Sequence, residues 1–121
     1  MNFSGINTYI CMRVNLIKKQ TVKEYVLKNA INKSSFEEWL SKIKSADWRK
    51  PTDIKNTFRT ADLLGKNSHK VVFDIGGNNY RIICKYAFGD NEIHLFICWI
   101  GTHAQYDQIC SRNEQYTISI Y

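Results

Sequence analysis

A histidine and a tyrosine stand three residues apart in a segment whose spacing predicts the start of a helix. His103 and Tyr106 lie in GTHAQYD over residues 101–107, where Thr102 and Gln105 have the spacing of a capping box. In such a helix both side chains share one face. Imidazole and phenol groups transfer protons, and a helix N-terminus attracts anions. The segment indicates proton transfer beside an anion such as phosphate, although an ordinary helix start with Tyr106 packed on a sheet explains it equally.

Two cations fall on one face of a predicted strand over residues 80–88. Arg81 and Lys85 alternate with apolar residues that point to the opposite face of that strand. A guanidinium group holds phosphate oxygens through two parallel hydrogen bonds, so we expect Arg81 and Lys85 at an open surface that binds phosphate. A solvated sheet face without a ligand is the alternative.

The elements that position these residues follow from a change in hydrophobic spacing after Gly65. The first half predicts a strand, two amphipathic helices that each open with a capping-box pattern, and a helical turn. The second half predicts three antiparallel strands and a helix, of which the nearly all-apolar last strand should lie inside the sheet. The expected elements cover residues 12–17, 21–31, 35–47 and 51–58 in the first half, and 70–75, 80–88, 93–100 and 102–110 in the second.

This order predicts an α+β fold with a small antiparallel or mixed sheet. Two N-terminal helices should pack on one face of the sheet, and a short helix should follow the last strand. The 121 residues are enough for a single domain, which we place over residues 12–121, with a polar appendage over residues 1–11. Residues 111–121 are predicted to form an edge strand or to be disordered.

The chain is basic, with 17 Lys and Arg against 11 Asp and Glu and a net charge of +6. This charge favours nucleic acid or an acidic protein as partner, although it also serves solubility alone. The longest apolar run is too short for a membrane span, which needs about 20 residues. None of the four cysteines has metal-ligand spacing, so we expect reduced thiols in a cytoplasmic protein, without a metal or other cofactor. The cysteines are Cys11, Cys84, Cys98 and Cys110.

Four segments in fixed order carry a resemblance to a known family. They are SADWRKPTDIKNTFRTADLLG (45–65), KVVFDI (70–75), GGNNYRIICK (76–85) and GTHAQYD (101–107). Together they resemble the HigB-type toxins of bacterial type II toxin–antitoxin pairs, which are ribosome-dependent mRNA endonucleases within the RelE/ParE-like fold. The similarity runs from Met12 to about Asp107.

The resemblance implies a sheet with an open concave face and functional residues on it. Matched position by position, Arg81, His103 and Tyr106 are implied as catalytic, and Asn78 and Lys85 match the motif as RNA-binding residues. We add two further basic residues as RNA-binding candidates because they lie close to the predicted sheet in sequence; these are Arg59 and Lys70.

The activity implied is metal-independent cleavage of mRNA by attack of a 2′-hydroxyl on the adjacent phosphate, with inhibition of translation. A non-catalytic gyrase inhibitor of the ParE type, or a degenerate toxin that only binds its antitoxin and helps repress the operon, are the alternatives. The implied partners are the ribosome, mRNA, an antitoxin with a helix-turn-helix domain and, through the antitoxin, operator DNA. The two predicted helices are our expected antitoxin contact surface, and the sheet face is the alternative; the outward lysines are Lys23, Lys28, Lys42 and Lys44.

Overall fold

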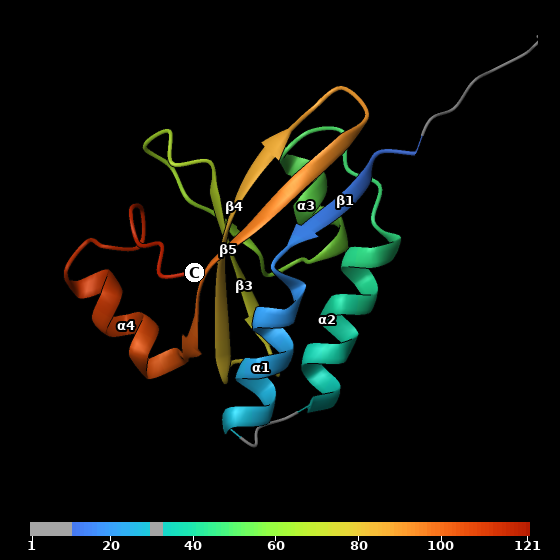
Figure 1. Cartoon of the computed structure of the whole chain (residues 1–121). Coiled ribbons are helices and arrows are strands. Elements are labelled where there is room, and N and C mark those ends of the chain that lie inside the picture. Colours follow the sequence, from blue (N-terminus) through green and yellow to red (C-terminus); the bar gives the residue numbers. More distant parts are fainter. Residues whose placement is uncertain (1–10, 30–32) are drawn as a thin grey trace, which may run out of the picture.

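A five-stranded mixed sheet forms the centre of the protein in a computed structural model that describes residues 11–29 and 33–121 (Figure 1). The strand order is β1-β5-β4-β3-β2. β1 runs parallel to β5, and the other neighbours are antiparallel. The mixed sheet confirms the predicted α+β class. The strands are β1 (Arg13–Ile17), β2 (Asp62–Leu63), β3 (Lys70–Ile75), β4 (Tyr80–Phe88) and β5 (Glu92–Thr102).

Helices cover both faces of the sheet (Figure 1). α1 (Lys19–Asn29), α2 (Lys33–Ser45) and α3 (Thr52–Thr57) lie on one side, and α4 (His103–Ser111) lies on the other. The main core lies between the sheet and the first three helices. Its aromatic centre includes an edge-to-face contact between Trp39 and Phe73, whose ring centroids are 5.3 Å apart. The two N-terminal helices therefore pack as the sequence predicts.

Both N-terminal helices begin two residues earlier than their predicted capping boxes. α1 starts at Lys19 rather than Thr21, and α2 starts at Lys33 rather than Ser35. Before α1 the chain turns through Lys18, which has a left-handed φ of 67°. β1 ends at Ile17, so this turn leads directly into the helix, and the tertiary connection sets the helix start in place of the local cap. The predicted appendage lies outside the described residues except for Cys11, and so do residues 30–32 between the two helices.

The face toward α4 is not the open surface that the sequence suggested. A second buried cluster covers it, and Cys98 and Trp99 both contribute because the β4–β5 register shifts between Ile83 and Cys84. This cluster excludes water from the part of the sheet face that α4 covers. Tyr106, which packs against the cluster, also lies next to Arg81. Its buried members are Val72, Ile83, Cys98, Trp99 and Ile109.

The C-terminal segment after α4 is neither an edge strand nor disordered. It forms turns that pack back onto the sheet, where the backbone N–H of Ile120 donates to the carbonyl of Cys98 at 2.9 Å. The Lys70 ammonium donates to the carbonyl of Ile118 at 2.6 Å. Tertiary contacts of β3 and β5 therefore hold this segment in place.

Candidate active site

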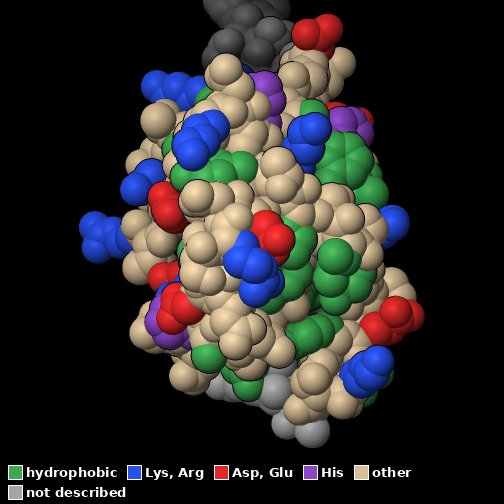
Figure 2. All heavy atoms as spheres, turned by 90° about the vertical axis from the view of Figure 1, so that its left-hand side faces the viewer, with side chains coloured by type: hydrophobic (Ala, Val, Ile, Leu, Met, Phe, Trp, Pro, Cys, Tyr) green, Lys and Arg blue, Asp and Glu red, His purple; other side chains and the backbone are tan. Residues whose placement is uncertain are grey.

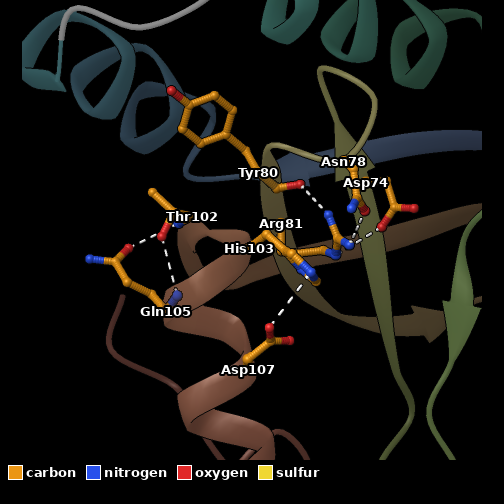
Figure 3. A network of polar contacts seen from close by, with 8 residues as sticks. All are labelled: Asp74, Asn78, Tyr80, Arg81, Thr102, His103, Gln105 and Asp107. Atoms are coloured by element: carbon orange, nitrogen blue, oxygen red, sulfur yellow. Dashed lines mark hydrogen bonds and ion pairs between the residues drawn. The ribbon is translucent and has the colours of Figure 1, made fainter.

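Arg81 is the most tightly held cation of the site. It lies opposite Asp74 in the β3–β4 register, and its Nε is 3.0 Å from Asp74 Oδ1 (Figure 3). Its Nη2 donates to Asn78 Oδ1 at 2.7 Å, and its Nη1 donates to the Tyr80 carbonyl at 3.1 Å. Arg81 is only 8% exposed, which corrects the expectation of an open surface. The cause is that Asp74, Asn78 and the Tyr106 ring of α4 surround the guanidinium.

The turn between β3 and β4 sets this arrangement. Gly76 and Gly77 have left-handed φ values of 65° and 69°, which glycine adopts without steric cost. The turn closes the hairpin in the register that places Asp74 across from Arg81, and it delivers Asn78 to the same guanidinium. The local sequence GGNN therefore fixes which carboxylate and which amide hold the arginine.

The first turn of α4 is joined to that hairpin. The Thr102 side chain accepts from the Gln105 backbone N–H, and the Gln105 side chain accepts from the Thr102 N–H, so the predicted capping box is confirmed. The backbone N–H of His103 donates to the Asn79 carbonyl at 3.0 Å. These bonds hold the first turn of α4, which carries His103, against the β3–β4 turn that precedes Arg81 (Figure 3).

His103 has one paired and one unpaired ring nitrogen. Its Nε2 lies 3.6 Å from Asp107 Oδ2 one helical turn later, and the side chain is 41% exposed. Its Nδ1 is buried and has no hydrogen-bond partner among the residues that the structure describes. The exposed part of the imidazole therefore includes Nε2, the nitrogen that faces Asp107.

Tyr106 packs between Arg81 and the second buried cluster. Its ring centroid lies 6.0 Å from the guanidinium carbon of Arg81 and 6.3 Å from the Trp99 ring centroid. Burial raises the pKa of the phenol strongly, and Cys110 and the charge of Asp62 raise it further, whereas Arg81 lowers it. The phenol therefore keeps its proton and acts in the neutral form.

The remaining predicted RNA-binding residues lie apart from this cluster. Lys85 is exposed farther along β4, directly opposite Lys70 of β3. Lys70 is 5% exposed, and burial, together with the charge of Lys85, lowers its pKa, although Cys98 opposes the shift. Arg59 lines a groove of 410 Å³ between α2 and the β3–β4 turn, and Asp74, the partner of Arg81, lines the same groove. The structure thus gathers Arg81, Asn78, His103 and Tyr106, with Arg59 in the adjoining groove, but not Lys70 or Lys85.

Sequence reasoning overlooked three carboxylates that surround the site. Asp74 holds Arg81, Asp107 faces His103, and Asp62 on the edge strand β2 acts on the Tyr106 phenol. The hairpin register across the GGNN turn is the sequence signal for Asp74, and the four-residue spacing from His103 is the signal for Asp107. No sequence signal indicates Asp62, because the two-residue strand β2 that contains it was not predicted.

The described residues hold neither a cluster of metal ligands nor a helix that could span a membrane. Within 11–29 and 33–121, no three His, Cys, Asp or Glu side chains gather as metal ligands. Within the same residues no helix has both the length and the apolar character of a membrane span.

Known proteins have sequences similar to that of this chain. Residues 32–109 match the family model HigB_toxin, described as the RelE-like toxic component of a toxin-antitoxin system. The chain belongs to the HigB toxin family. It is also 26% identical over 96 residues to the mRNA interferase HigB of Escherichia coli O6:H1, a match that covers 79% of this chain and 91% of that protein. Family membership confirms the resemblance. The family match covers α2, α3, the strands β2 to β5 and α4 as far as Ile109, and so includes Arg81, His103 and Tyr106.

Proposed function

We propose that this HigB family member is a toxin that cleaves mRNA on the ribosome without a metal ion. The observation that carries the proposal is the buried Arg81, aimed by Asp74 and Asn78, close to the first turn of α4, whose His103 imidazole is 41% exposed. The name of the Escherichia coli relative, an mRNA interferase, supports an endoribonuclease activity.

Arg81 is suited to bind the scissile phosphate. A guanidinium has five N–H donors, and the three contacts to Asp74, Asn78 and Tyr80 leave two of them for phosphate oxygens. Since the protein already holds the side chain, little reorganisation is needed when negative charge develops in the transition state. Arg81 therefore neutralises the phosphorane.

One proton transfer is assigned to His103 and the other to Tyr106. The 2′-hydroxyl oxygen attacks the adjacent phosphorus, the bond from phosphorus to the 5′ oxygen breaks, and a cyclic phosphate and a 5′-hydroxyl result. An imidazole exchanges protons near neutral pH, so His103 accepts the proton of the 2′-hydroxyl. Because the raised pKa keeps the Tyr106 phenol protonated, Tyr106 donates a hydrogen bond or its proton to the leaving oxygen.

The ribosome supplies what this small site lacks. Two proton-transfer groups and one arginine bind little of the RNA, whereas in-line attack requires the nucleotide in one conformation. We place the substrate in the decoding site of the cytoplasmic ribosome, where the mRNA is already held. Asn78 acts by orienting Arg81, Lys85 attracts the RNA backbone, Lys70 supports the C-terminal segment, and Arg59 attracts RNA to the groove that it lines together with Asp74.

The test is expression of the chain followed by mapping of mRNA 5′ ends. Growth and translation should stop, and fragments should end in a cyclic phosphate and a 5′-hydroxyl. His103→Ala and Arg81→Ala should relieve the arrest at equal protein level, whereas His69→Ala, a histidine exposed outside the site, should not. Purified protein should cut mRNA only with ribosomes, at chelator concentrations that leave ribosomes intact. Cutting of naked RNA that requires added magnesium contradicts the proposal.

The same experiment separates the rival functions. A non-catalytic gyrase inhibitor arrests growth through DNA damage, leaves mRNA ends unchanged and tolerates the loss of His103. A degenerate toxin that only binds its antitoxin arrests nothing. Either outcome replaces the endonuclease while leaving the family assignment in place.

We also propose the groove between α1 and α2 as the antitoxin contact. Its floor is apolar and its volume is 260 Å³, and Leu27 at its margin is 76% exposed. Lys23, Lys33 and Glu37 line it, and Lys33 lies 3.9 Å from Glu37, so Lys23 is the cation that favours an apolar segment with an acidic flank. Leu27→Asp should weaken antitoxin binding, measured by calorimetry, and reversal of the charges of Lys23, Lys28, Lys42 and Lys44 should weaken it at low salt. Unchanged affinity would move the contact to the sheet face. Through a helix-turn-helix domain in the antitoxin, the complex would reach operator DNA.

A further inference from the structure

Phe96 of β5 is an exposed aromatic side chain on the α4 side of the sheet. It is 40% exposed, although its neighbours Leu95 and Ile97 are buried on the other face. Its ring stacks on His94, with centroids 6.2 Å apart and ring planes at 28°. Ala87 lies opposite His94 in β4 and is too small to cover the pair. The two stacked rings form an accessible aromatic pair, which we call the Phe96 platform.

A lysine-lined groove begins beside the Phe96 platform. Lys85 lies directly opposite Phe96 in the β4–β5 register and also lines a groove of 470 Å³. Lys66 and Lys70 line the same groove, and among the described residues no Asp or Glu does. Figure 2 looks onto this side and shows Lys and Arg side chains over its upper and middle part, with apolar patches between them. We call this groove the lysine groove.

The C-terminal segment forms one wall of the lysine groove. Tyr116, Thr117 and Ser119 line it, and Lys66 Nζ lies 4.5 Å from the centroid of the Tyr116 ring. The bond from Lys70 to the Ile118 carbonyl holds this wall against β3. The wall lies beyond residue 109, where the family match ends.

The lysine groove and the proposed active site lie on the same strand and the same face. Lys85 follows Arg81 by four residues of β4, which corresponds to about 13 Å along an extended strand. One single strand of nucleic acid can therefore reach both. Proteins that bind single strands combine cations that follow the phosphates with aromatic rings on which bases stack.

We infer that the Phe96 platform and the lysine groove together bind single-stranded RNA next to the cleaved nucleotide. A base stacks on Phe96 and His94, and the backbone phosphates follow Lys85 and Lys66 toward Arg81. The inference rests on the proposed function for its substrate, but binding is measured without cleavage. An acidic protein segment is the competing occupant, and the ring chemistry of Phe96 distinguishes the two because only bases require an aromatic plane.

The experiment uses the full chain and a fluorescent 2′-O-methyl oligonucleotide, which lacks the attacking hydroxyl. Fluorescence anisotropy should show that Phe96→Leu lowers affinity about tenfold, whereas Phe96→Trp preserves it. Lys66→Ala and Lys85→Ala should each reduce the slope of log affinity against log salt by about 0.7. Lys55→Ala, an exposed lysine of α3 on the opposite side of the sheet, is the matched control and should change neither quantity.

Each outcome decides the inference. If Phe96→Leu binds within twofold of the wild type, or if Lys85→Ala leaves the salt slope unchanged, the site is refuted. If Phe96→Leu and Phe96→Trp lose antitoxin affinity but keep oligonucleotide affinity, the surface is a protein contact. Loss of ribosome-dependent cleavage in a chain that still binds the oligonucleotide in this pattern would refute the proposed function and leave the binding site standing.

Discussion

The pair of Asp74 and Arg81 provides a stability test of the site's architecture. Asp74→Ala removes the carboxylate that lies 3.0 Å from Arg81 Nε, where the two side chains are 25% and 9% exposed. The gross Coulomb attraction at that distance is roughly 5 kcal/mol with an effective dielectric constant of 20. Desolvation of the buried guanidinium offsets much of it, and Asn78 and Tyr80 still accept from the arginine. We expect Asp74→Ala to lower the free energy of unfolding by about 2 kcal/mol.

A double-mutant cycle separates this loss from ordinary loss of packing. Arg81→Met keeps most of the buried aliphatic stem and removes the charge, so Asp74→Ala combined with Arg81→Met should be destabilised by less than the sum of the two single variants. Urea unfolding followed by tryptophan fluorescence measures all four proteins. The exposed pair of Glu38 and Lys42, at 3.5 Å, is the control, and Glu38→Ala should change stability by less than about 0.5 kcal/mol.

The reasoning fails if the two substitutions are additive within about 0.5 kcal/mol. Additivity would mean that Arg81 is held by Asn78 and the Tyr80 carbonyl, without energetic coupling to Asp74. Asp74→Ala would then leave cleavage unchanged as well. Under the proposed mechanism the same variant instead loses activity, because the guanidinium is no longer aimed.

Three further predictions follow from the helix cap and the C-terminal segment. Gly101→Ala should destabilise the protein by about 1–3 kcal/mol in urea unfolding, since the new methyl group would meet the Trp99 ring at 2.4 Å, whereas Gly65→Ala, with nothing within 4 Å, should be neutral. Thr102→Ala should lower stability by about 1 kcal/mol and slow mRNA cleavage, because it opens the capping box before His103; equal cleavage rates would contradict this. Deletion of residues 113–121 should lower the midpoint of thermal unfolding, followed by circular dichroism, because it uncovers the ammonium of Lys70; an unchanged midpoint would show that the segment contributes no stability.

Local sequence was sufficient to predict two features in which the interacting residues are close neighbours in the chain. The capping box of Thr102 and Gln105 forms because the interacting groups are three residues apart. The hairpin over residues 70–88 forms because period-two spacing and a GGNN turn agree. These two features are also the ones that position His103 and Arg81, so the candidate residues could be named before any tertiary structure was known.

Contacts between distant segments decided the features that the sequence alone left open or predicted wrongly. α1 begins at Lys19 and α2 begins at Lys33, each two residues before the predicted capping box. β1 leads directly into α1, and core packing outweighs the local preference of a single cap residue. Arg81 is buried and Lys70 is bound because α4 and the C-terminal segment return to a face whose strand pattern looks solvated. A strand's alternation shows which residues share a face, but not what covers it, since the covering residues come from elsewhere in the chain.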